Sequence, residues 1–246
     1  MRTRSRRLRR LVVLPAIVVA GCSATAIPRI ANTPADFFPL APNSRWEYVV
    51  SRRGGSERFR YVAAVRQDEF FAADGRACRI VDERYADVSA EQRFPVVYCA
   101  EGGFLHRVMS LEYRGDSLED NGLRSGEVKF LPTDLSHAHT WEGRTNAYRL
   151  PDGSGFVVQQ LHQAVPERGP IVVPAGQFSH CVRVDTTAIH SATAPDGEPV
   201  GTRVIFYYSD WYAPEIGLVK TEQRSTDAQV LATIELVDYE IGGKAR

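Results

Sequence analysis

The chain has 246 residues, 43% of them hydrophobic, and its 30 basic residues balance its 30 acidic residues. Residues 1–21 contain six Arg and no acidic residue, so residues 22–246 hold 24 basic against 30 acidic residues, a net charge of about −6. This charge argues against a nucleic-acid or anionic-lipid surface, which needs clustered basic side chains. The length and composition suit one domain with a sizeable core.

The N-terminus carries a basic segment followed by an apolar run over Leu11–Ala20. Arg side chains resist translocation, and this run is much shorter than the ~20 residues that span a bilayer as a helix. The run ends in Val19-Ala20-Gly21-Cys22, which resembles the lipobox of bacterial lipoprotein precursors. The resemblance implies cleavage of a signal peptide before Cys22 and attachment of palmitate there. The alternatives are an ordinary secretory signal cut near residues 24–26 and an uncleaved anchor.

The residue after Cys22 bears on the membrane that holds the protein. In lipoproteins that follow the familiar retention rule, Asp at this position keeps the protein at the inner membrane. Ser23 therefore favours a lipid-anchored protein of the cell envelope, at the outer membrane and facing the periplasm. The predicted organisation is a signal peptide over 1–21, a lipidated N-terminus and spacer over 22–35, and a single β-rich domain over 36–246.

The rest of the chain alternates short strand patterns with turn signals. Trp46, Tyr48 and Val50 alternate with polar residues, as in a strand with one buried face, and Asp74-Gly75 is a typical hairpin turn. About twelve such runs follow one another, joined by turns that are too short for parallel crossovers. The sequence therefore predicts an all-β antiparallel meander. A sheet this long must curl or close, so we expect a strongly curved half-barrel or open barrel, with a β-sandwich as the alternative.

Three cysteines remain besides Cys22. Cys78 and Cys99 lie on neighbouring strand-like runs, and a turn centred on residues 87–90 places them directly opposite each other. Opposed residues of an antiparallel pair have Cβ atoms ~4.5–5.5 Å apart, close to the span of a disulfide. We expect a Cys78–Cys99 disulfide, with two buried free thiols as the alternative. Cys181 lies in an apolar run and is expected to be a core thiol.

Three short motifs together resemble the TapB-like group of bacterial envelope proteins and lipoproteins, whose function is unknown. They are Phe38-Pro39-Leu40 followed by Trp46-Glu47-Tyr48, Val173-Pro174-Ala175-Gly176-Gln177-Phe178 followed by Cys181-Val182-Arg183-Val184, and Trp211-Tyr212-Ala213-Pro214-Glu215-Ile216-Gly217-Leu218-Val219-Lys220. Asn43 stands where the group usually has Gly, and Asn tolerates positive φ better than most residues. The resemblance implies a curved antiparallel sheet and no catalytic residue.

Few residues point to chemistry. His137 and His139 would share one face of a strand and could bind a metal with Asp134 or Glu142 as a third ligand, but this stretch has the pattern of a loop. No Ser elbow and no phosphate-binding loop is found. The aromatic residues either fill the core with one face of the sheet or leave an apolar concave face for a lipid or another hydrophobic ligand, with Trp46, Tyr48, Tyr207 and Trp211 as candidates.

We therefore expect a protein without catalytic activity and without a cofactor, which binds a partner protein or an apolar ligand at the membrane. The alternative is a metal-dependent hydrolase that uses His137 and His139.

Overall fold

The computed structural model describes residues 37–54, 58–71, 75–86, 93–108, 111–114, 117–120, 128–133, 135, 139–149 and 153–245. These residues form β-strands joined by turns. The strands are β1 (Arg45–Arg52), β2 (Arg58–Phe71), β3 (Ala77–Tyr85), β4 (Arg93–Glu101), β5 (Phe104–Val108), β6 (Leu111–Arg114), β7 (Ser117–Asp120), β8 (Val128–Pro132), β9 (Thr140–Arg149), β10 (Gly155–Pro166), β11 (Ile171–Val173), β12 (Gly176–Phe178), β13 (Val182–Thr193), β14 (Pro199–Ala213), β15 (Gly217–Arg224), β16 (Val230–Ile241) and β17 (Lys244–Ala245).

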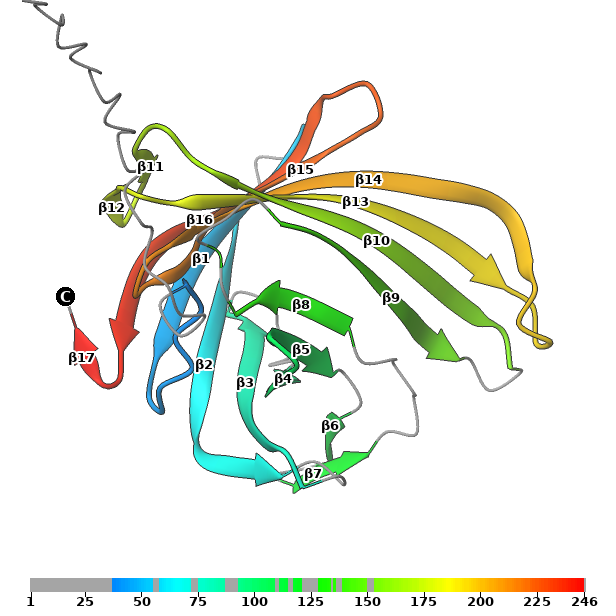
Figure 1. Ribbon diagram of the computed structural model, residues 1–246, viewed down its shortest axis with the longest axis horizontal. Helices are drawn as coiled ribbons and strands as arrows, with labels where there is room; N and C mark the ends of the chain where they lie inside the picture. The colour runs from blue at the N-terminus through cyan, green and yellow to red at the C-terminus, as the bar shows by residue number, and fades with distance from the viewer. Residues whose placement is uncertain are drawn as a thin grey trace, which may run out of the picture.

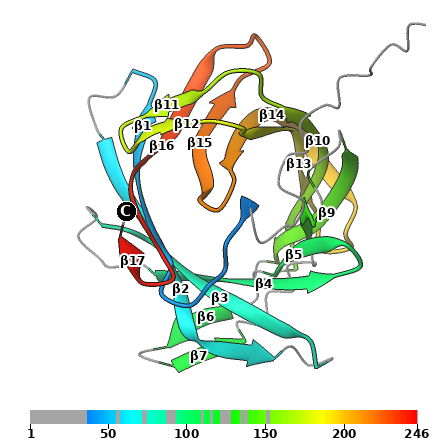
Figure 2. The same ribbon diagram turned by 60° about the vertical axis from the view of Figure 1, so that its left-hand side comes forward.

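One large antiparallel sheet contains most of these strands. Its order is β8-β5-β4-β3-β2-β1-β16-β15-β14-β13-β10-β9, and β17 adds to β16. Because the first long strand, β1, lies between β2 and β16, the two ends of the domain meet in the middle of the sheet. Figure 1 shows β9, β10, β13 and β14 as one curved layer, and Figure 2 shows the strands arranged around a ring. The prediction of an antiparallel meander curved into an open barrel is confirmed.

The strands alternate as a sheet with one buried face requires. In β1, Trp46, Tyr48 and Val50 are buried while their neighbours are partly exposed, and β13 follows the same two-residue period. Successive side chains of a strand point to opposite faces, so this alternation turns the aromatic face of β1 toward the barrel interior. Burying these side chains against one another stabilises the curved form, at roughly 25 cal/mol per Å² of apolar surface.

The barrel has one seam, between the terminal strands β8 and β9. These strands form no ladder with each other in the described part of the chain. They nevertheless lie close together, because a Cβ added at Gly143 of β9 would lie only 3.0 Å from Cγ1 of Val128 of β8. Glycine at position 143 therefore permits the close approach that brings the two ends of the sheet together.

The segment before β1 enters the barrel rather than covering it from outside. Figure 2 shows this blue segment within the ring of strands. Phe37 is fully buried, and the Phe38 ring contacts those of Tyr98 and Phe130 at centroid distances of 4.9 and 5.2 Å. The following turn has Asn43 at φ 65°, the positive value that the sequence predicted Asn to tolerate there. One end of the interior is thus filled by the chain itself.

Two small hairpins lie off the main sheet. The β6–β7 hairpin lies beside β4, and the β11–β12 hairpin packs on β15 and β16, where the amide of Ala175 donates to the carbonyl of Leu236 at 2.9 Å. The disulfide between Cys78 and Cys99 joins β3 to β4, and the two residues are directly paired in the sheet. The expected disulfide is therefore confirmed.

Candidate ligand-binding cavity

The barrel interior contains a cavity of about 460 Å³. Its walls come from the segment before β1 and from nine strands of the main sheet, so the cavity exists only because the sheet curls. Small-molecule sites have volumes of roughly 300–1,000 Å³ and are lined mainly by apolar and aromatic groups. The aromatic residues that line this cavity are Phe38, Trp46, Tyr48, Tyr61, Tyr85, Phe94, Tyr98, Phe130 and Tyr212.

The two ends of the cavity differ. At one end, the Phe38 ring packs against Tyr98 and closes the cavity. Phe94 lies four residues before Tyr98 on the same face of β4, and its side chain is 42% exposed. The Tyr61 and Tyr85 rings, 5.5 Å apart, form the wall on the Phe94 side. The cavity therefore opens near Phe94 and ends at Phe38.

Three charged side chains also line this mainly aromatic cavity. They are Glu83 of β3, Arg107 of β5 and Asp210 of β14. Nη2 of Arg107 lies 3.8 Å from Oε2 of Glu83, and Nε of Arg107 is buried without a hydrogen-bond partner among the described residues. Burial lowers the pKa of Arg107, but Tyr98, Glu83 and Tyr61 outweigh this effect and raise that pKa above its ordinary value. Arg107 is therefore a permanent cation inside the barrel.

Asp210 is held on the opposite wall. Its Oδ1 accepts a hydrogen bond from Oγ1 of Thr221 at 2.6 Å. Burial raises the pKa of Asp210 to about 6, with a smaller contribution from Asp185, while Thr221 and Arg107 act in the opposite direction. Asp210 therefore changes its charge just below neutral pH, whereas Arg107 keeps its charge.

The tyrosines supply neutral hydroxyl groups to the cavity. Tyr48 donates its hydroxyl to the carbonyl of Leu218 at 3.0 Å, which fixes its ring against the wall. Burial raises the pKa of Tyr48, Tyr61, Tyr98 and Tyr212 above the ordinary value of tyrosine, and for Tyr61 a hydrogen bond to Glu83 adds to the effect. The cavity thus combines rigid aromatic surface with a few hydrogen-bonding groups.

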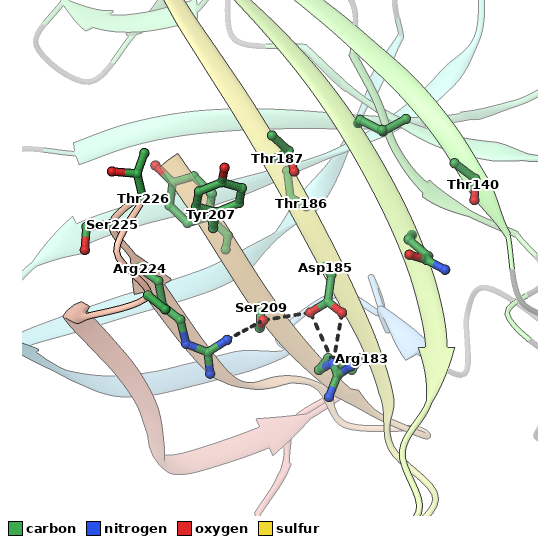
Figure 3. Close-up of a pocket in the computed structure, with 14 residues that line it drawn as sticks. Thr140, Arg183, Asp185, Thr186, Thr187, Tyr207, Ser209, Arg224, Ser225 and Thr226 are labelled. Atoms are coloured by element: carbon green, nitrogen blue, oxygen red, sulfur yellow. Dashed lines mark hydrogen bonds and ion pairs between the residues drawn. The ribbon is translucent and has the colours of Figure 1, made fainter. Parts of the chain in front are cut away.

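A second hollow, of about 530 Å³, lies on the outer face of β10, β13, β14 and β15 (Figure 3). Asp185 lines it and alternates with Val184, which belongs to the interior core, so Asp185 faces outward. Its carboxylate accepts from Ser209 at 2.7 Å and from Nε of Arg183 at 3.1 Å. Arg224 pairs with Glu222 in the same way. Because each cation here already has a carboxylate partner, we place the candidate site inside the barrel.

The structure separates the four aromatic residues that the sequence singled out. Trp46 and Tyr48 line the cavity, and Trp46 donates its indole N–H to the carbonyl of Ile216 at 2.6 Å. Tyr207 is 39% exposed and lines the outer hollow. Trp211 lies outside the cavity, where it donates to Glu167 at 3.1 Å and Lys220 lies over its ring. On β14 it is the even-numbered Asp210 and Tyr212 that line the cavity, not the odd-numbered aromatic residues.

Sequence reasoning missed the charged residues of the cavity. Glu83, Arg107 and Asp210 are far apart in the chain and stand among ordinary surface charges in the sequence. The one available signal was the two-residue period of a strand, which places residues i and i+2 on the same face. Arg107 therefore shares its face with the core residue Leu105, and Asp210 shares its face with the core residue Tyr212. A charge at a core position of a strand is uncommon and indicates a special role.

The predicted metal and thiol residues have mixed placements. His137 and Asp134, like Cys22, lie outside the described residues. His139 precedes β9, and Glu142 of β9 is exposed. In the part of the chain that the structure describes, no three His, Cys, Asp or Glu residues gather as they would around a metal ion.

Cys181 is a fully buried free thiol, and burial together with Glu167 raises its pKa to about 11. The described residues contain no helix long and apolar enough to cross a membrane.

The fold and the cavity define the chain as a curved antiparallel β-barrel protein with an internal cavity. No protein-family model matches it, and no curated protein matches it significantly. Two crystal structures resemble it. One is a protein from Bacteroides fragilis assigned as exported, with a YmcC-like fold (15% identity, TM-score 0.46, 83% of this chain and 99% of that one). The other is a protein from Parabacteroides distasonis assigned as a lipoprotein (15% identity, TM-score 0.48, 85% of this chain and 100% of that one).

Proposed function

We propose that this protein is a lipid-anchored protein of the cell envelope that binds a small apolar or amphipathic ligand inside its barrel and catalyses no reaction. The observation that carries the proposal is the cavity of about 460 Å³ with aromatic walls around it. A preformed cleft of this size, apolar except for a few polar groups, is the usual form of a small-molecule site. The ring contacts of Phe38 and the hydrogen bonds of Trp46 and Tyr48 hold the walls in place.

The location is proposed from the N-terminal sequence. Cys22 follows a lipobox-like stretch, and Ser23 favours the outer membrane, with the domain facing the periplasm. The Cys78–Cys99 disulfide supports an oxidising compartment such as the periplasm. The spacer of residues 22–35 leads almost directly to Phe37, which is buried in the barrel. The lipid and the barrel would therefore be joined by this spacer, which when fully extended at ~3.3–3.6 Å per residue spans at most roughly 45–50 Å.

Two measurements test the anchor. Wild-type protein, expressed with its full N-terminus and labelled palmitate, is expected in the membrane fraction with the label bound. A Cys22→Ala variant is expected to lose both the label and the membrane attachment. Label retained by the variant would contradict lipidation at Cys22.

The ligand is tested separately, by native mass spectrometry of the Cys22→Ala protein purified without detergent. We expect a co-purified small molecule. An Ala63→Leu variant narrows the cavity and should carry less of it, whereas the matched change Ala86→Leu at an exposed turn should not alter the amount. Reproducibly empty protein would contradict the binding function. Stoichiometric zinc that is lost in a His137→Ala, His139→Ala double variant would instead support the hydrolase alternative.

A further inference from the structure

We infer that the ligand of the barrel is an aliphatic carboxylic acid whose carboxylate is bound by Arg107. This inference rests on the proposed binding function and names the class of ligand. It starts from the position of Arg107 on β5, whose side chain lines the cavity and remains 31% exposed. As a lining residue, Arg107 is among the groups that a ligand in the cavity would contact.

The partners of Arg107 leave room for an anion. Among the described residues, the carboxylate paired with Arg107 is that of Glu83, whose Oε2 lies 3.8 Å from Nη2, beyond hydrogen-bond distance. Glu83 also takes part in a hydrogen bond with Tyr61. Nε is buried and has no hydrogen-bond partner in the described part of the chain. A guanidinium carries five N–H donors in a planar fork that matches a carboxylate or a phosphate. A buried guanidinium with an unpaired donor is unfavourable, so the site favours an anion that binds the guanidinium.

The other charges in the cavity select an anion with a single charge. Glu83 lies beside Arg107, and Asp210 lines the same cavity. A phosphate dianion would meet repulsion from both carboxylates, whereas a carboxylate brings only one charge. The tyrosine hydroxyls of the cavity can donate to either group, so they do not decide between the two.

The cavity walls suit the apolar part of the ligand. From Arg107 the walls continue through Val81 and Val50 toward Phe94 at the open end, while Phe38 blocks the inner end. Aliphatic and aromatic side chains line this path, and burial of each CH₂ of a ligand against them strengthens binding. The carboxylate would therefore lie at Arg107, with the chain against these aliphatic and aromatic walls.

The test compares ligands that share one chain and differ in the headgroup. Delipidated Cys22→Ala protein is titrated by calorimetry with dodecanoate, dodecanol and dodecyl phosphate. We expect dodecanoate to bind at least tenfold more tightly than the other two. Equal affinity for dodecanoate and dodecanol would overturn the role of Arg107 and leave the proposed function intact. Binding of none of the three would overturn both, and tighter binding of dodecyl phosphate would overturn the carboxylate assignment.

Variants locate the effect. Arg107→Gln should remove the preference for dodecanoate over dodecanol, and Arg107→Lys, which keeps the charge without the fork, should keep part of it. The matched control is Arg183→Gln on the outer face, where the Arg is paired with Asp185 and the preference should persist. If the Arg107→Gln variant still binds dodecanoate more tightly than dodecanol, the inference is overturned. If this variant does not fold, the headgroup comparison on the protein with Arg107 still decides.

Discussion

Trp141 of β9 donates its indole N–H to the backbone carbonyl of Lys129 of β8 at 3.3 Å. These two strands are the ends of the twelve-strand path, and they form no ladder with each other among the described residues. A side chain thus links the two ends of the sheet at the seam. Trp141 is buried, and its ring stacks on His162 at a centroid distance of 4.9 Å, so the link is part of the core.

The seam gives the first prediction. Replacing Trp141 by Phe removes the hydrogen bond and part of the buried ring, so we expect a loss of about 1–3 kcal/mol in the free energy of unfolding. Amide hydrogen exchange should become faster in β8 and β9 while the other strands of the main sheet change little, because β8 and β9 form no ladder with each other in the described part of the chain.

The matched control is Trp46→Phe. Trp46 also donates to a backbone carbonyl, that of Ile216, but β1 is paired with β2 and β16 along both edges. Its loss of stability should be similar, without faster exchange at the seam. Equal exchange changes in both variants would contradict the special position of Trp141.

The disulfide gives a second prediction. Cys78 and Cys99 are 21 residues apart, and a crosslink that closes a loop of this size stabilises a protein by roughly 3 kcal/mol through the unfolded state. A Cys78→Ser, Cys99→Ser double variant should lose about this amount in urea unfolding. Cys181→Ala serves as the control, because it removes a free thiol and keeps the disulfide. Reductant should lower the stability of Cys181→Ala and of wild type by the same amount.

Asp210 gives a third prediction, on pH. Burial raises its pKa to about 6 in the folded protein, from an ordinary value of 3.8. The folded state therefore holds this proton more tightly than the unfolded state, so the contribution to stability is present below pH 4 and is lost as the pH rises to 6. An Asp210→Asn variant should lack this loss, and relative to wild type it should gain about 2 kcal/mol on going from pH 4 to pH 7. A constant difference between the two proteins in urea unfolding across this range would contradict the assignment.

His162 gives the opposite prediction in nearly the same range. Its Nδ1 is hydrogen-bonded to Oγ1 of Thr186 at 2.8 Å, and burial lowers its pKa to about 4. The unfolded state takes up the proton first, so stability is lost as the pH falls from 6.5 to 4. A His162→Gln variant should avoid a loss of about 2 to 3 kcal/mol that wild type suffers between pH 7 and pH 4.5.

The two groups offset each other in the wild type. We therefore expect a nearly flat pH profile from this pair in wild type and opposite slopes in the two single variants. The double variant should be flat again, because Asp210 and His162 are expected to act independently. If both single variants change the slope in the same direction relative to wild type, the burial of one of the two groups is contradicted.

Local patterns of the sequence were enough for the strands, the turns and one crosslink. The alternation of Trp46, Tyr48 and Val50 predicted the buried face of β1, and the spacing of Cys78 and Cys99 predicted their pairing. The resemblance to the TapB-like group placed Asn43 in a turn that can require positive φ, and Asn43 has φ 65°. Each of these features depends on neighbours along the chain or across one hairpin, where the two-residue period and the turn length set the geometry.

The sequence by itself determined an antiparallel sheet that had to curl, and it placed aromatic residues on its strands. It did not determine which face of β14 would turn inward, because Tyr207 and Trp211 are as aromatic as the inward Tyr212. Nor could it bring Asp210 of β14 to the same interior as Glu83 and Arg107, because β14 lies far from β3 and β5 in the order of the sheet and approaches them only when the sheet curls. Long-range closure decided the site, because curvature and the seam between β8 and β9 determine which side chains share the interior.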